Sequence, residues 1–213
     1  MSKTKPVSKS KSKAPAHLSA RVATLQKRLK KIGVDGLLVT NPRDIRYLTG
    51  FVGDDSWAVI PTKGSDVYLL SDFRFQEQIE REAPHARTFI RSAGLADELL
   101  KVREKGHLKD LGIQSDYVTV AMAKALGKKI GKKHLEPVAD GLLKQRAVKS
   151  PEEVAAIKAA LKIQQQAFVD LRDVLKPGET EQQVAASLEF LMRSTGADGP
   201  SFPTIIAADA NAS

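Results

Sequence analysis

The sequence predicts an α/β protein, in which a three-layer domain with a mixed sheet is followed by the start of a second, α+β domain. Three observations carry this prediction. Strand-length apolar runs alternate with amphipathic repeats of helical period over about 120 residues from residue 19 onward. Two of the runs are separated by a hairpin-type turn, so the sheet contains antiparallel as well as parallel strands. A strong helix-start signal at Ser150 then marks a second domain.

The first half of the α/β domain contains one helix and three strands. A helix ending at Gly33 is predicted from apolar residues at helical spacing: Val22, Leu25, Leu29 and Ile32. Residues 36–40 read as a strand buried on both faces, ending in a turn at Asn41-Pro42. Residues 57–60 and 66–70 read as a hairpin closed by the turn residues 61–64.

The second half of this domain continues the alternation. Phe75, Ile79 and Ala83 share one helical face before Pro84, and residues 88–90 are extended. Residues 107–111 fit a helix or a strand. Further helices are predicted at 97–104 and 118–126, and a last strand at 135–138. Residues 127–133 form a basic loop, for which a solvated surface is favoured over an anion site.

The second domain opens with a capping box. Ser150 and Glu153 can satisfy the first backbone donors of a helix that has Pro151 at its first position. Thr180 and Gln183 repeat the device for a second helix, and residues 201–207 read as a strand. The predicted organisation is a disordered Lys/Ser/Pro-rich tail at 1–18, the α/β domain at 19–146 and the start of the second domain at 147–213.

Composition excludes several classes of protein. No apolar run is long enough to cross a bilayer, no signal core opens the chain, and the absence of cysteine suits a cytoplasmic location. The net charge of +9 arises largely in the tail, so nucleic-acid binding is not expected. Five lysines lie there without an acid, which leaves +4 for the rest of the chain: Lys3, Lys5, Lys9, Lys11 and Lys13.

A search for chemistry finds a fold without an active site. The four histidines are scattered, and none lies three or four residues from another. Asp54-Asp55 fits a turn better than a cation site. The paired glutamates at 152–153 and at 179 and 181 are explained by helix starts. We therefore predict no catalytic residue, no metal ligand and no cofactor on this chain.

Six segments in order resemble the family of metallopeptidases that contains prolidase, aminopeptidase P and creatinase. Residues 143–153 (LKQRAVKSPEE) resemble the signature Leu-Arg-x-x-Lys-Ser-Pro-x-Glu that opens the family's catalytic domain. Residues 41–51 (NPRDIRYLTGF) resemble the Asn-x-x-Tyr-Leu-Thr-Gly-Phe motif of its N-terminal domain. The other four matching segments are 71–75, 111–117, 176–181 and 196–206.

The resemblance implies the N-terminal part of a Xaa-Pro peptidase with a pita-bread fold. Family enzymes use two divalent metals, commonly Mn²⁺, to cleave the bond before proline, and all their metal ligands would lie beyond Ser213. The chain is therefore expected to be truncated and inactive alone, although its family is hydrolytic. Phe202 and Ile205 match positions that face the substrate cleft in relatives, or else are ordinary core residues. A homodimer is expected, and a non-catalytic dimerisation or interaction module is the alternative function.

Overall fold

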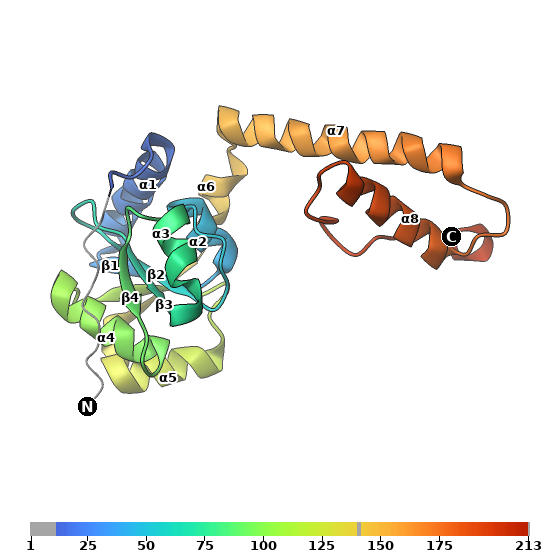
Figure 1. The fold of residues 1–213 in the computed structure, drawn as a ribbon. Helices are drawn as coiled ribbons and strands as arrows, with labels where there is room; N and C mark the ends of the chain where they lie inside the picture. Colours follow the sequence, from blue (N-terminus) through green and yellow to red (C-terminus); the bar gives the residue numbers. More distant parts are fainter. Residues whose placement is uncertain (1–11, 140–141, 213) are drawn as a thin grey trace. The chain divides into compact units, whose positions relative to one another are not determined.

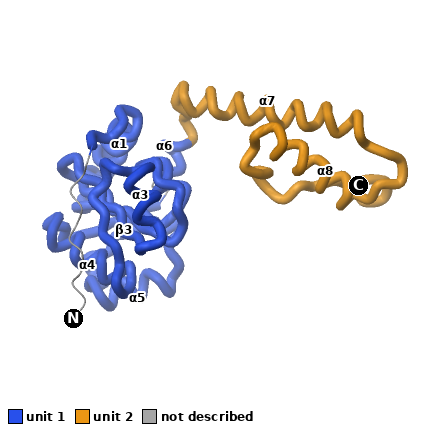
Figure 2. The backbone as a smooth tube through the Cα atoms, viewed as in Figure 1, with its two compact units in different colours: residues 1–146 blue, residues 147–213 orange. Residues whose placement is uncertain are grey.

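The computed structural model describes residues 12–139 and 142–212. The chain forms two compact units, residues 1–146 and residues 147–213 (Figure 2). Most of the predicted tail lies outside the described residues. Helix α1 (Ala16–Ile32) begins within the last three residues of that predicted tail, because Leu18 is buried and adds a turn to the helix.

Unit 1 is built on a six-stranded mixed sheet with strand order β4-β3-β2-β1-β5-β6 (Figure 1). The predicted hairpin is present, since β2 (Trp57–Pro61) pairs antiparallel with β3 (Tyr68–Ser71). The central strand β1 (Gly36–Val39) pairs antiparallel with β2 and parallel with β5 (Leu111–Gln114). At one edge of the sheet β4 (Arg87–Ile90) pairs parallel with β3, and at the other edge β6 (Leu135–Val138) pairs parallel with β5.

Helices cover both faces of the sheet, so the predicted three-layer α/β domain is confirmed. Alternate residues of β1 supply the two cores, with Leu37 and Val39 on one face and Leu38 on the other. The first face packs against α1, α2 (Pro42–Thr49) and α3 (Gln76–Glu82). The second packs against α4 (Leu95–Gly106) and α5 (Val120–Ile130).

Three local predictions need correction. Asn41-Pro42 starts a helix instead of a turn, because the Asn41 side chain accepts a hydrogen bond from the Arg43 amide and proline fits the first helical position. The ambiguous segment contains the start of β5 at Leu111. The basic segment is largely helical: α5 runs through Ile130, and a short 3-10 helix, η2 (Lys132–His134), follows it.

Short elements connect the main ones. Asp72 caps a 3-10 turn, η1 (Phe73–Phe75), that leads into α3, and its side chain accepts a hydrogen bond from the Arg74 amide. Helix α6 (Leu143–Ala147), which the sequence analysis did not predict, ends unit 1. Its residue Gln145 donates hydrogen bonds to the Arg21 carbonyl and to the Tyr47 hydroxyl, so α6 is docked on α1 and α2.

Unit 2 is a helical hairpin. Helices α7 (Pro151–Val174) and α8 (Glu181–Ser194) pack together and both start with the predicted capping boxes. The predicted strand at 201–207 is wrong: this segment has no regular structure and leads to a 3-10 turn, η3 (Asp209–Ala212). A strand needs a hydrogen-bonded neighbour, and the described part of unit 2 contains none.

Candidate functional site

The two predicted cleft residues lie on the irregular segment that follows α8. Phe202 is 66% exposed and Ile205 is 79% exposed. Two hydrogen bonds tie this segment to α8. The Thr204 hydroxyl donates to Glu189 at 2.7 Å, and the Ala208 amide donates to Glu181 at 2.8 Å. Phe202 and Ile205 are therefore surface residues of unit 2.

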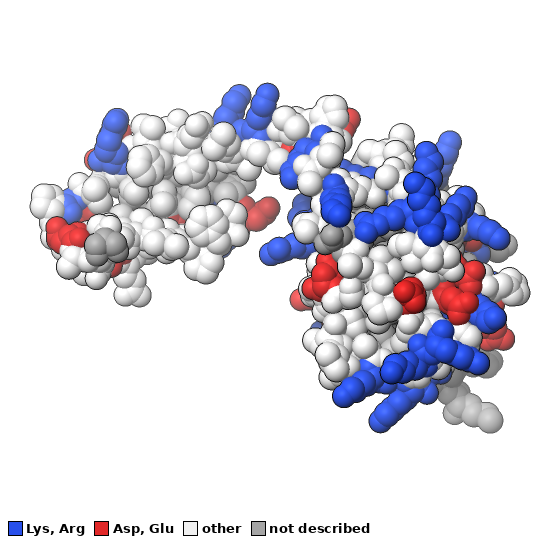
Figure 3. Space-filling view, turned by 180° about the vertical axis from the view of Figure 1, so that it is seen from behind, with Lys and Arg blue, Asp and Glu red and all other residues white. Residues whose placement is uncertain are grey.

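Unit 2 exposes an unusual amount of apolar side chain. In its described residues the buried hydrophobic side chains are Ala167, Leu171 and Met192. Figure 3 shows that the visible face of this unit is mostly uncharged. The apolar side chains along α7 are mostly at the surface. The exposed ones include Val154, Ile157, Leu161 and Phe168, with Leu175 directly after the helix, and Phe190 of α8 is also exposed.

The titratable side chains of the described residues do not form a metal site. No group of three or more His, Asp or Glu side chains is placed to hold an ion in that part of the chain. His134 instead bonds Asp110, with 2.7 Å between Nδ1 and Oδ1. His85 is buried, its Nε2 has no partner, and this burial lowers the pKa of its imidazole.

Asp55 is an ion-pair residue. Its carboxylate contacts Arg74 at 3.0 Å and Arg91 at 2.6 Å, and the same two arginines contact Asp72. The bond from Arg74 holds the pKa of Asp72 well below its usual range and raises the pKa of Arg74. The four side chains fasten the loop before β2 to the ends of β3 and β4, which is a structural role.

A buried polar network joins α6 to the sheet. Gln114, at the end of β5, accepts hydrogen bonds through Oε1 from the amides of Thr40 and Asn41, at 2.8 and 3.1 Å. Its Nε2 donates to Asp44 Oδ2 at 2.6 Å, and Asp44 Oδ1 accepts from Arg146 at 3.0 Å. Side chains from two distant segments that resemble family motifs, 41–51 and 143–153, therefore meet in one network.

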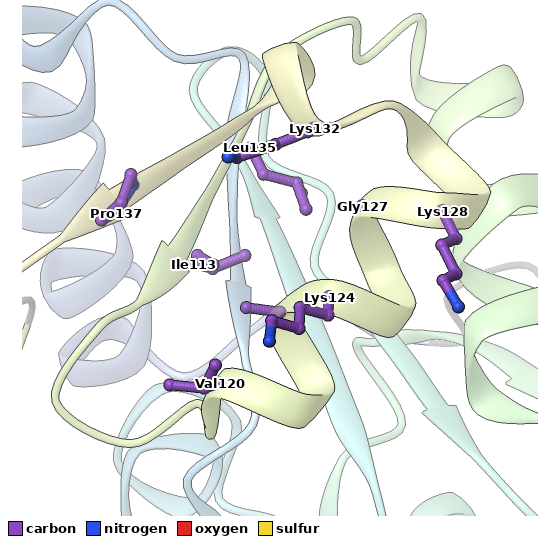
Figure 4. Close-up of a pocket in the computed structure, with 9 residues that line it drawn as sticks. Ile113, Val120, Lys124, Gly127, Lys128, Lys132, Leu135 and Pro137 are labelled. Atoms are coloured by element: carbon purple, nitrogen blue, oxygen red, sulfur yellow. The ribbon is translucent and has the colours of Figure 1, made fainter.

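A hollow of about 620 Å³ lies between α5 and the β5–β6 edge of the sheet (Figure 4). We call it the α5–β6 hollow. Its lining is apolar apart from three lysines, and it is formed by Ile113, Val120, Ala123, Lys124, Gly127, Lys128, Lys132, Leu135 and Pro137. This volume and this lining fall within the usual range of small-molecule sites.

Sequence reasoning missed the α5–β6 hollow, although a signal was present. Lys124, Lys128 and Lys132 recur every fourth residue, next to the small residues Ala123 and Gly127. Lys124 and Lys128 lie one turn apart on α5, and Lys132 follows in η2 after the helix breaks at Gly131. Reading residues 127–133 as a loop hid that pattern.

Comparisons with known proteins identify the family. Residues 21–148 match the Creatinase/Prolidase N-terminal domain, and residues 155–213 match Metallopeptidase family M24. The chain belongs to the creatinase/prolidase N-terminal domain family.

Several relatives carry peptidase names. The uncharacterized peptidase YqhT of Bacillus subtilis is 33% identical over 187 residues, which cover 88% of this chain and 52% of that protein. A Xaa-Pro dipeptidase of Pyrococcus horikoshii is 26% identical over 190 residues, covering 89% of this chain and 52% of the relative. The solved Xaa-Pro dipeptidase from Bacillus anthracis superposes with a TM-score of 0.82 at 28% identity, over 89% of this chain and 53% of that one. The chain thus spans about half the length of these relatives.

Proposed function

We propose that this chain is the N-terminal portion of a Xaa-Pro aminopeptidase- or dipeptidase-like metallopeptidase and that it does not hydrolyse peptides by itself. The observation that carries the proposal is the order of the two family matches: a match to the Creatinase/Prolidase N-terminal domain is followed by a match to Metallopeptidase family M24. The relatives named Xaa-Pro dipeptidase support the substrate class, which is peptides with proline in the second position.

The residues of this chain do not fit a pair of divalent metals. Such a pair needs several convergent carboxylate and imidazole ligands. Within residues 12–139 and 142–212 no cluster of this kind exists, and Asp55, Asp72, Asp110 and His134 are already engaged with one another or with arginine. We therefore derive no catalytic step on this chain and assign it no catalytic residue.

We assign residues 19–146 to the creatinase-type domain and residues 147–213 to the start of the catalytic domain, in agreement with the two compact units. In the complete protein Phe202 and Ile205 would face the substrate cleft, since both are accessible. A homodimer in the cytoplasm is proposed; the absence of cysteine suits the reducing compartment. No helix of the described chain combines the length and the apolar character needed to cross a bilayer.

A second candidate function is a non-catalytic dimerisation or interaction module derived from the same family. The exposed apolar side chains of α7 and α8 favour it, because an apolar surface of this kind is typical of a protein interface. Reading the coding DNA after Ser213 separates the two candidates. A Leu-Pro-His continuation in any frame supports the peptidase portion, whereas a stop without such codons supports the module.

The enzymatic test uses the 213-residue chain with added Mn²⁺ and a Xaa-Pro peptide. We expect no release of the N-terminal residue and no stoichiometric retention of metal after gel filtration. An intact Xaa-Pro dipeptidase assayed beside it confirms that the substrate and the metal are competent. Chelator-sensitive turnover by the purified chain, or one equivalent of tightly held metal, would refute the proposal. The mass of the chain in solution, measured by light scattering, tests the homodimer.

A further inference from the structure

The α5–β6 hollow combines an apolar interior with a cationic rim. Ile113, Ala123 and Leu135 supply apolar surface from β5, α5 and β6. The side chains of Lys124 and Lys132 lie on opposite sides of Ile113 and Leu135, and Lys132 extends toward the β6 side (Figure 4). No acidic side chain of the described residues pairs with Lys124, Lys128 or Lys132. An apolar ligand that carries one negative charge would match both features.

The free edge of β6 cannot accept a peptide strand. The Ser115 amide bonds the Val138 carbonyl, so Val138 faces β5 and its neighbour Pro137 faces the free edge. Proline has no amide hydrogen, and the amide of Leu135, the other outward residue, already bonds the Lys132 carbonyl. A complete ladder with an added strand needs outward donors as well as acceptors, and the residues of β6 offer carbonyl acceptors alone. A small ligand is therefore favoured over an extended peptide.

The chain's own N-terminal segment is an unsuitable occupant. It carries five lysines and no acid within its first thirteen residues. The three lysines of the hollow would repel it, because like charges brought close together destabilise a contact. The charge of the rim requires an anion.

We propose that the α5–β6 hollow binds a soluble single-chain carboxylate with an apolar tail, chemically a medium-chain fatty acid. The tail lies against Ile113, Ala123 and Leu135, and the carboxylate remains at the rim, in the positive potential of Lys124 and Lys132, which flank the hollow from opposite sides. Desolvation of the tail supplies the affinity, and the lysines select the anion over neutral or cationic amphiphiles. This site is independent of any peptidase activity.

Binding is tested by calorimetry on the 213-residue chain with sodium decanoate below its micelle concentration. We expect saturable binding of one equivalent, weakened by added salt because the charges at the rim are exposed. Decanol is expected to bind less tightly, and decyltrimethylammonium is expected not to bind. Equal affinity for decanoate and decanol at low salt would overturn the role of the lysines.

Two variants test the two halves of the site. The Lys124→Gln/Lys132→Gln pair should weaken the binding of decanoate by about two- to fivefold for each lysine, which corresponds to the free energy that exposed ion pairs contribute. The matched control Lys27→Gln/Lys31→Gln removes the same charge from α1, outside the hollow, and should leave the affinity unchanged. Ala123→Phe places a ring in the hollow and should abolish binding. The lysine variants keep the test valid if Ala123→Phe fails to fold, which its circular dichroism would reveal.

Location is tested by amide chemical shifts, because the exposed apolar surface of unit 2 is a competing site. Decanoate should shift the amides of Ala123, Gly127 and Leu135. Shifts confined to α7 and α8, or equal loss of affinity in both lysine pairs, would overturn the proposal. So would co-sedimentation with phosphatidylglycerol vesicles that decanoate does not reverse, since that outcome identifies a membrane surface as the partner.

Discussion

Replacing Gln114 tests whether the network beneath α6 stabilises unit 1. The Gln114→Met substitution keeps the length of the side chain but removes both polar atoms. It leaves the amides of Thr40 and Asn41 without their acceptor and removes the donor to Asp44. Thr40 is buried, whereas Asn41 is partly exposed and can be rehydrated. One buried amide costs about 1–3 kcal/mol, and a bond to a carboxylate contributes about 1.5–3 kcal/mol. We therefore expect a loss of about 3–5 kcal/mol.

Urea unfolding followed by the fluorescence of Trp57 measures this loss. Trp57 is the single tryptophan and lies in β2, so its emission reports on unit 1 alone. A loss below about 1 kcal/mol would refute the reasoning, because it would mean that water replaces the amide group of Gln114 without cost.

Gln114→Glu gives the matched control. It retains the acceptor for Thr40 and Asn41 but places a second carboxylate against Asp44, at the 2.6 Å contact that the amide now occupies. Two carboxylates in one site raise the pKa of one of them, so the native state of the variant binds an extra proton. The difference in free energy of unfolding between the variant and the unchanged protein should therefore shrink as the pH falls from about 8 to 5, with the variant gaining stability toward the acid end.

Three further outcomes are expected. Burial lowers the pKa of His85, so below about pH 6.5 the unfolded chain binds a proton that the native chain does not. The free energy of unfolding should therefore fall as the pH drops from 7 to 5, and a His85→Leu variant should lose this dependence. A slope of equal size in both proteins would contradict this. Ser150→Ala should lower the stability of α7 by about 1 kcal/mol, because it removes the acceptor of the Glu153 amide. Circular dichroism at 222 nm should show a lower unfolding midpoint, and an unchanged midpoint would mean that the cap is dispensable. In limited proteolysis, residues 151–213 should be cut before residues 19–145, since unit 2 has so few buried side chains; equal resistance of the two parts would count against this.

Much of the fold could be predicted from the sequence because its local signals agree with the final packing. The helix starts with a capping box were predicted correctly, since a pair such as Ser150 with Glu153 satisfies backbone donors without help from the rest of the chain. The hairpin of β2 and β3 was likewise encoded in its own turn. Strand β5 was missed because Gly112 interrupts its apolar run. That glycine is required by tertiary packing, since a Cβ there would lie 2.8 Å from the Val138 side chain.

The candidate sites were less predictable, because they depend on segments far apart in the chain. The strand expected at 201–207 has the right residues but no neighbour to pair with in the described structure. Phe202 and Ile205 therefore lie at the surface, and their proposed role depends on protein beyond this chain. The α5–β6 hollow depends on the register of β5 and β6, which brings Ile113 beside Pro137. No local pattern specifies that register.

The shortage of donors on β6 limits how copies of this protein can join. Aggregation through sheets usually proceeds by adding strands at both margins of a sheet, and here one margin offers no amide to a newcomer. On the opposite margin, the amides of Arg87 and Arg91 donate hydrogen bonds to the β3 side of the sheet. The amides of Thr88 and Ile90 alternate with them along β4 and therefore point outward. Two molecules can thus meet through β4, but neither then has a second side from which a fibre could grow.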